Sequence, residues 1–181
     1  GDIRRIPDIY GMDDGLMNEC IIEVSGLKKS YGAVPAVNGI TFSVCKGQLA
    51  ALLGPNGAGK STVVNILSTI IGFDEGSVII AGEDIRRNGR KIRKNIGVVF
   101  QNGVLDERLT VYENLRVRGD FYGVRGKQLN GHIEEAAEMT GIQEIMDRFY
   151  GTLSGGQKRR CDIARALLHS PKILFLDEPT A

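Results

Sequence analysis

Short apolar runs bounded by glycine alternate along the chain with longer segments that have helical periodicity. The short runs are rich in β-branched residues, which is typical of strands. They are residues 21–24, 40–44, 48–53, 78–81, 96–100 and 173–176. The last two runs are continuously apolar, which predicts parallel strands buried on both faces.

Four longer segments predict helices, because their apolar residues recur at helical spacing. They are residues 60–71, 110–121, 128–140 and 155–169. The first directly follows the strand predicted at 48–53 and a glycine-rich loop. The other three lie between the last two strands, so a helical insert separates two parts of an α/β core.

Composition narrows the class of protein. The 181 residues are the size of one ordinary domain, and 42% of them are hydrophobic. With 23 basic and 22 acidic residues, the chain lacks the basic excess expected of a nucleic-acid-binding protein. No run is long enough to cross a bilayer. The cysteines Cys20, Cys45 and Cys161 are scattered and odd in number, which favours a reducing compartment and small buried side chains.

The glycine-rich segment matches the phosphate-loop motif GxxxxGK(S/T). It consists of Gly54, Pro55, Asn56, Gly57, Ala58, Gly59, Lys60 and Ser61. Glycines allow the backbone N–H groups to surround phosphate oxygens, and the start of the next helix adds positive potential. Lys60 is placed to reach the β and γ phosphates, and the Ser61 hydroxyl is placed to bind Mg²⁺. The segment predicts nucleotide binding, but the reaction stays open because kinases, GTPases and motor ATPases share this loop.

Two carboxylates follow the last predicted strand. Asp177 stands at the carboxyl end of the strand, where it can hold Mg²⁺ directly or through water. Glu178 follows, and can act as the general base that polarises an attacking water. The alternative is a solvated turn before Pro179, and the presence of the phosphate loop favours the catalytic interpretation.

Residues 153–157 read LSGGQ and precede a predicted helix. Ser154 is a natural N-cap, while Gly155 and Gly156 leave the first N–H groups open to a phosphate. An ordinary capped helix is the alternative for this segment on its own. Gln157 completes the motif.

The order and approximate spacing of these motifs resemble those of the ABC transporter ATPases. The motifs are the phosphate loop, Gln101, LSGGQ at 153–157 and LFLDEP at 174–179. The resemblance covers nearly all of residues 19–181, and LSGGQ is its specific element. The chain contains no NKxD motif, which argues against a GTPase. The implied fold is α/β: a P-loop NTPase (RecA-like) core, an N-terminal antiparallel β subdomain and a helical signature subdomain.

The resemblance also implies roles for single residues. Tyr31 would stack on adenine, with a surface aromatic as the alternative. Gln101 would contact Mg²⁺ and the attacking water and sense the membrane partner, with a plain loop residue as the alternative. Thr62 would touch the α phosphate, with helix capping or packing as the alternative.

The resemblance further implies the assembly in which these residues work. Two ATPase domains, identical or different, close head to tail, so that Ser154 and Gly156 of one chain meet the γ phosphate held by Lys60 of the other. ATP and Mg²⁺ are the implied cofactors. ATP binding and hydrolysis would drive a separate integral membrane permease, with the ATPase peripheral on the cytoplasmic face of the membrane and no nucleic acid involved.

The predicted organisation is a disordered leader at 1–18, a nucleotide-binding core with the β subdomain and phosphate loop at 19–100, a helical signature subdomain at 101–161, and a return to the core at 162–181. The resemblance implies that the family's later motifs lie beyond Ala181, including a strand between those at 48–53 and 173–176. We therefore expect the 181-residue chain alone to be poorly stable and to hydrolyse little ATP.

Residues 104–115, followed by Phe121, Tyr122 and Gly123, resemble exporters of the drug-resistance type, in which the ATPase is a separate chain. This implies a permease that docks near residues 101–108 and a drug, lipid or polysaccharide as cargo. Two alternatives stay open. One is a soluble ABC-type ATPase acting on ribosomes or DNA, which a single cassette without basic excess disfavours. The other is a fragment that binds nucleotide without hydrolysing it.

Overall fold

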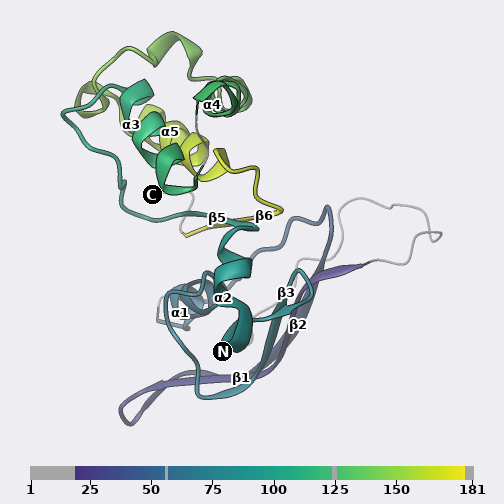
Figure 1. The fold of residues 1–181 in the computed structure, drawn as a ribbon. Helices are drawn as coiled ribbons and strands as arrows, with labels where there is room; N and C mark the ends of the chain where they lie inside the picture. Colours follow the sequence, from purple (N-terminus) through teal and green to yellow (C-terminus); the bar gives the residue numbers. More distant parts are fainter. Residues whose placement is uncertain (1–18, 56, 124–125, 178–181) are drawn as a thin grey trace. The chain divides into compact units, whose positions relative to one another are not determined.

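A computed structural model of the chain describes residues 19–55, 57–123 and 126–177 (Figure 1). The predicted leader at 1–18, Asn56 and Glu178 lie outside these ranges. The chain divides into two compact units, one within Gly1–Arg93 and the other within Lys94–Ala181. Among the described residues, no helix is long and apolar enough to cross a membrane.

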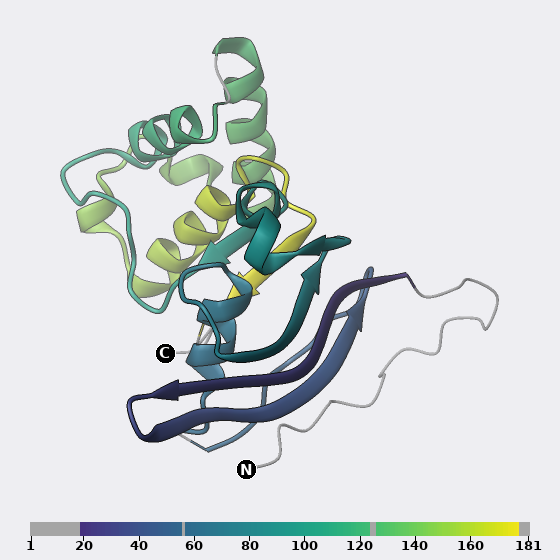
Figure 2. The ribbon, with the colours of Figure 1, turned by 60° about the horizontal axis from the view of Figure 1, so that its bottom comes forward.

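The first unit is built on an antiparallel sheet with the strand order β2-β1-β3-β4. Its strands are β1 (Cys20–Tyr31), β2 (Val34–Cys45), β3 (Glu75–Ile80) and β4 (Glu83–Asp84). β1 and β2 form a long curved hairpin (Figure 2). Val24 and Leu27 of β1 and Val78 and Ile80 of β3 are buried. The strands predicted at 21–24, 40–44 and 78–81 are therefore present, and the first two extend well beyond the predicted bounds.

The strand predicted at 48–53 is wrong. The segment belongs to none of the described strands, although Leu53 forms a single β-bridge, and the side chains of Leu49 and Leu53 are 96% and 49% exposed. A strand forms only where a neighbour accepts and donates its backbone hydrogen bonds. The sheet of the first unit already has its own edges at β2 and β4 and does not pair with this segment. The apolar sequence of a segment indicates that it favours a β conformation, but it does not show whether a neighbouring strand is present to pair with it.

Two helices belong to the first unit: α1 (Lys60–Leu67) and α2 (Ile85–Arg93). α1 is shorter than the predicted 60–71, because Ser68 caps it and Thr69 takes a positive φ of 63°. The sequence did not predict α2. Its residues IRRNGRKIR offer only two apolar positions, and it is kinked at Asn88, so the helical period was not visible.

The second unit contains the parallel pair β5 (Ile96–Val99) and β6 (Ile173–Leu176). The predicted strands and their parallel orientation are confirmed. The expectation that both are fully buried holds for β5 except at the partly buried Val98, but not for β6, where Leu174 and Leu176 are 36% and 37% exposed. Within the described part of the chain β5 is the only strand that pairs with β6, so one edge of β6 has no covering neighbour.

Helices make up the rest of the second unit. They are α3 (Val111–Phe121), α4 (Gly126–Thr140) and α5 (Gly155–Leu167), with the 3-10 turns η1 (Gln143–Ile145) and η2 (Tyr150–Thr152). One hydrophobic cluster joins them, and it includes Leu115, Ile133 and Ala164. Gly119 lets α3 approach α4 closely, since a Cβ there would collide with Leu129. The helical insert predicted between the two strands is thus a packed unit.

Candidate nucleotide-binding site

The phosphate loop ends in a backbone conformation that only glycine adopts without strain. Gly57 and Gly59 both have a φ of 82°, in the left-handed region. Gly59 is also the N-cap of α1, and a Cβ there would collide with the carbonyl oxygen of Ala36. The loop can therefore turn into the helix only with glycine at this position, as the motif predicts.

Lys60 is held across the loop by two carbonyl groups. Its ammonium donates to Gly54 O at 2.7 Å and to Pro55 O at 2.9 Å. The next helical residues are Ser61, which is exposed, and Thr62, which is half-buried. Gly59 has no side chain that could take up the amides of this first turn. The loop thus presents a cation and a helix start, which are the elements of a phosphate site.

Tyr31 lies at the end of β1, and the phosphate loop approaches this end of the hairpin. Tyr31 pairs with Val34 in the register of β1 and β2, and Ala36, which touches Gly59, is two residues further along β2. The Tyr31 side chain is 53% exposed. The fold therefore brings the proposed adenine-stacking residue into the neighbourhood of the loop, 23 or more residues further along the chain.

In the second unit, the parallel pairing brings Gln101 and Asp177 to the same edge of the sheet. β5 ends at Val99, and the backbone N–H of Asp177 donates to Val99 O at 2.9 Å. Gln101 follows two residues after Val99. Both proposed metal-binding residues thus stand where the carboxyl ends of two parallel strands meet.

Arg159 ties this edge to the signature helix. From the first turns of α5, its guanidinium donates to Phe100 O at 2.5 Å and to Asp177 O at 3.1 Å. One side chain therefore holds the residue before Gln101 and the backbone of Asp177 itself. Three consecutive basic residues at a helix start, here Lys158 to Arg160, predict a solvated basic face. This fits Arg160, which is exposed, and Lys158, which pairs with the exposed Glu107, but not the half-buried Arg159.

We expect Arg159→Met to lower the free energy of unfolding by about 2–4 kcal/mol, since two charge-assisted hydrogen bonds are lost. ATP turnover in the full protein should fall about tenfold, because Gln101 and Asp177 lose their common anchor. Lys158→Met is the matched control. Its partner Glu107 is 70% exposed, so the pair contributes about 0–1 kcal/mol. Chemical denaturation and a steady-state ATPase assay check both. Equal effects of the two variants would contradict the anchoring role.

The LSGGQ segment forms the predicted N-cap. The Ser154 hydroxyl accepts from Gln157 N at 3.3 Å, and the Gln157 side chain accepts from Ser154 N at 3.0 Å. Gly155 and Gly156 are exposed, and open space lies where a Cβ would stand. A reciprocal capping box thus fixes the helix start while the two glycines keep it accessible to a ligand.

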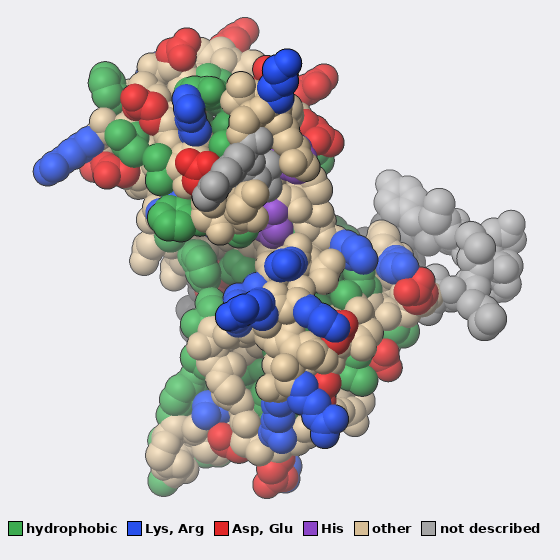
Figure 3. Space-filling view, in the orientation of Figure 1, with side chains coloured by type: hydrophobic (Ala, Val, Ile, Leu, Met, Phe, Trp, Pro, Cys, Tyr) green, Lys and Arg blue, Asp and Glu red, His purple; other side chains and the backbone are tan. Residues whose placement is uncertain are grey.

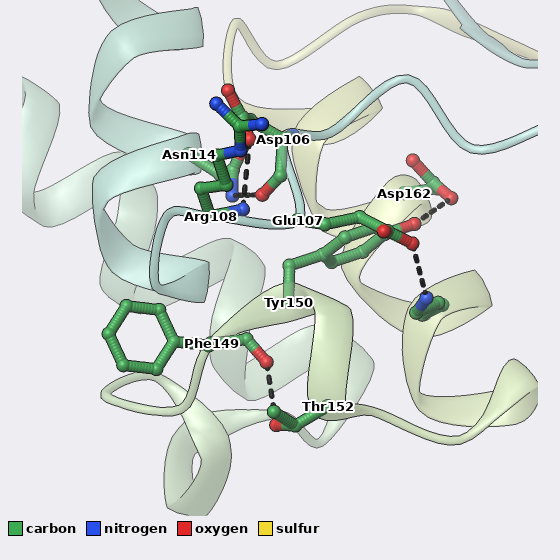
Figure 4. A network of polar contacts seen from close by, with 9 residues as sticks. Asp106, Glu107, Arg108, Asn114, Phe149, Tyr150, Thr152 and Asp162 are labelled. Carbon is green, nitrogen blue, oxygen red and sulfur yellow. Dashed lines mark hydrogen bonds and ion pairs between the residues drawn. The ribbon is translucent and has the colours of Figure 1, made fainter.

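A buried hydrogen bond joins Tyr150 of η2 to Asp162 of α5 (Figure 4). The Tyr150 hydroxyl donates to Asp162 Oδ2 at 3.0 Å, and Val104 N lies 3.5 Å from Asp162 Oδ1. Burial, followed by the charge of Asp162, raises the pKa of Tyr150 well above its ordinary value. A Cβ at Gly103 would lie only 2.5 Å from the Tyr150 hydroxyl. The segment after Gln101 is thereby packed against α5.

Sequence reasoning did not single out Arg159, Tyr150 or Asp162. A signal was available: Arg159, Asp162 and Arg165 recur every three residues beside the apolar face of the predicted helix, and charged side chains on such a face need buried partners. Cys161 behaves as expected of a buried thiol, with burial raising its pKa to about 11. Cys20 and Cys45, predicted to be isolated, instead face each other across β1 and β2, with their sulfurs 3.6 Å apart.

The loop geometry at Gly59 and Lys60, followed directly by α1, defines a phosphate-loop NTPase. A profile described as ABC transporter matches residues 37–181. The chain belongs to this family.

Relatives of known type agree with that assignment. The chain is 42% identical to the Nod factor export ATP-binding protein I of a Rhizobium species over 91% of its own length and 54% of that protein's. It is 39% identical to the linearmycin resistance ATP-binding protein LnrL of Bacillus subtilis, over 88% of the chain and 51% of the relative. The chain thus spans about half the length of these curated relatives.

Among solved structures, the fold matches cbiO1 from Clostridium perfringens, part of the ABC transporter complex cbiONQ. The TM-score is 0.83 at 32% identity, and the match covers 90% of this chain and 67% of that one. ABC ATPase domains bind ATP, so ATP is the nucleotide of this family's phosphate loop. The predicted P-loop NTPase fold is confirmed.

Proposed function

We propose that the protein is the ATP-hydrolysing subunit of an ABC transporter that exports its substrate through a separate membrane permease. The proposal depends on one observation: the chain contains two helix N-termini whose backbone N–H groups are open to a ligand. One follows Gly59 and bears Lys60, and the other follows Ser154 and is lined by two open glycines. ATPases of this family use both, and other phosphate-loop families lack the second.

Each proposed residue has a defined task. The loop Gly54–Ser61 with Thr62 would bind the phosphates, and Tyr31 would stack on adenine. Ser61, Gln101 and Asp177 would hold Mg²⁺, for which hydroxyl, amide and carboxylate oxygens are suitable ligands. Bound Mg²⁺ would neutralise charge on the phosphates. Glu178, outside the described residues, would polarise the attacking water.

The complete site would be shared between two chains. Ser154, Gly155, Gly156 and Gln157 of one subunit would cover the γ phosphate bound at Lys60 of its partner. The exposure of both glycines supports this proposal, because a helix start that served only its own fold would gain nothing from remaining uncovered. ATP would then favour the closed dimer, and hydrolysis would release it.

The exporter assignment rests on the relatives' names and on residues 104–123. It places the protein on the cytoplasmic face of the membrane, with the permease docking near residues 101–108. We propose the same domain organisation as the sequence predicts: a nucleotide-binding core formed by residues 19–100 and 162–181, and a signature subdomain formed by residues 101–161.

Two capping boxes in the chain allow a matched test of the signature motif. Thr110 caps α3 with Glu113 just as Ser154 caps α5 with Gln157. We expect Ser154→Ala and Thr110→Ala each to lower the free energy of unfolding by about 1 kcal/mol. Only Ser154→Ala should also reduce ATP turnover of the full protein, by about tenfold, because only this hydroxyl would meet the γ phosphate.

Denaturant titration and a steady-state ATPase assay give the two readouts. If both variants lose stability and neither loses turnover, Ser154 is only a cap and the shared site is wrong. No measurable turnover in the unaltered full protein would overturn the proposed activity itself.

A further inference from the structure

α2 is the most basic element of the chain. Five of its nine residues are Arg or Lys and none is acidic: Arg86, Arg87, Arg90, Lys91 and Arg93. All five are exposed. Figure 3 shows Lys and Arg side chains gathered on the face where α2 lies in Figure 1. Clustered like charges repel unless an anion or a solvated surface compensates them.

Three of these arginines line a hollow in the first unit. Arg86, Arg90 and Arg93 face the turn after α1, and the pocket has a volume of about 390 Å³. The remaining lining residues are Thr69, Ile70, Ile71, Gly72, Phe73, Ile85 and Gly89. Arg87 and Lys91 belong to the same helix but do not line this pocket. Three of the five basic side chains of α2 thus line the pocket, and the other two lie outside it.

Neutral contacts hold two of the guanidinium groups in place. Arg86 Nη2 donates to Asp74 O at 3.2 Å, and its guanidinium lies 4.2 Å from the ring centroid of Phe73. Arg93 Nη1 donates to Thr69 Oγ1 at 3.1 Å. Gly89 makes room for this group, since a Cβ there would stand 3.3 Å from Arg93 Nη1. These contacts orient the guanidinium groups without neutralising them.

Nearby carboxylates are engaged elsewhere. Asp74 accepts from Ser30 N and Lys29, Glu83 pairs with Lys91, and Asp84 accepts from the backbone N–H of Arg86 and Arg87. None of the ion pairs within the described ranges uses Arg86, Arg90 or Arg93. The three guanidinium groups at the pocket therefore have no carboxylate of these ranges paired with them.

We propose that this pocket binds a phosphate group, as a second anion site separate from the phosphate loop. Guanidinium groups present planar forks of N–H donors that match phosphate oxygens. Three guanidinium groups around one pocket can donate hydrogen bonds to several oxygens of one phosphate. A planar carboxylate has only two oxygens and typically accepts both bonds from a single guanidinium group. Ile70, Phe73 and Ile85 supply apolar side chains to the same pocket. The phosphate can belong to a soluble compound or to a lipid headgroup.

Binding is best tested in a Lys60→Met background of the full protein, which removes the phosphate loop's contribution. Radiolabelled inorganic phosphate in equilibrium dialysis probes the soluble source. Flotation with phosphatidylcholine vesicles, with and without phosphatidylglycerol, probes the lipid source. Both are run at physiological ionic strength, where exposed charges are largely screened beyond about 8 Å.

The decisive comparison is Arg90→Ala against Arg87→Ala, because each removes one charge from α2 and only Arg90 lines the pocket. We expect Arg90→Ala to weaken binding of at least one phosphate source about tenfold, and Arg87→Ala to change it less than about twofold. Thermal melting establishes that both variants fold. Equal losses would show diffuse attraction and overturn the proposal, as would competition by succinate equal to that of phosphate. Absence of saturable binding of either source would also overturn it, and none of these outcomes bears on ATP hydrolysis.

Discussion

Lys60→Met should reduce ATP hydrolysis by the full protein about a hundredfold or more. The Lys60 ammonium is held over the loop by Gly54 O and Pro55 O, at the place where the β and γ phosphates of ATP would lie. Charge stabilisation by a fixed donor is among the largest contributions to phosphoryl transfer. Methionine keeps the length of the side chain and removes only the charge and the donors. A steady-state phosphate-release assay measures the effect.

Lys46→Met is the control for this prediction. Lys46 is an exposed lysine of the same unit that pairs with Glu19, and its loss should leave turnover within about twofold. Retention of near-normal hydrolysis in Lys60→Met would mean that the loop does not bind the reacting phosphates. Thermal melting of both variants shows whether the loss of the two Lys60 hydrogen bonds also lowers stability, so that an effect on folding is separated from an effect on the chemistry.

Glu178→Gln in the full protein should lower hydrolysis about a hundredfold or more while ATP binding persists. A general base contributes about 10²–10⁴ to a rate, and glutamine keeps the shape of the side chain without its basicity. If hydrolysis releases the closed dimer, as proposed above, the variant should accumulate as a dimer that retains ATP. Size-exclusion chromatography with light scattering, with and without Mg·ATP, measures this directly.

The two variants together separate binding from chemistry. Lys60→Met should neither hydrolyse ATP nor dimerise with it, whereas Glu178→Gln should dimerise without hydrolysing. Monomers that retain ATP in Glu178→Gln would contradict the shared site. Normal turnover in Glu178→Gln would instead assign the base to another residue.

The local parts of the site could be predicted from the sequence because their physics is local. The left-handed φ at Gly59 and the capping box of Ser154 with Gln157 each depend on a few consecutive residues. The same is true of the helix that begins at Lys60 and of the strand that ends before Asp177. A motif encodes such features directly, since backbone conformation and capping follow from the neighbouring side chains.

The parallel pair β5 and β6 was predicted across a long separation in the chain because both runs are continuously apolar. Other features that required a distant partner were predicted wrongly or not at all. Residues 48–53 have the composition of a strand, yet they form none, and only Leu53 takes part in a single β-bridge. Arg159 looked like one of three solvated charges, and its role became visible only when α5 was seen beside the ends of β5 and β6. α2 was missed because its basic residues hide its helical period, and its pocket exists only because the turn after α1 packs beside it.

The sequence by itself therefore determined the family, the order of the motifs and the local geometry of each helix start. Tertiary structure alone decided that Tyr31 lies near the loop, that Gln101 and Asp177 share one sheet edge, and that three arginines converge on one pocket. The physical reason is that turns and caps are set by short-range sterics and hydrogen bonds, whereas a shared edge or a pocket depends on which distant segments exclude water together.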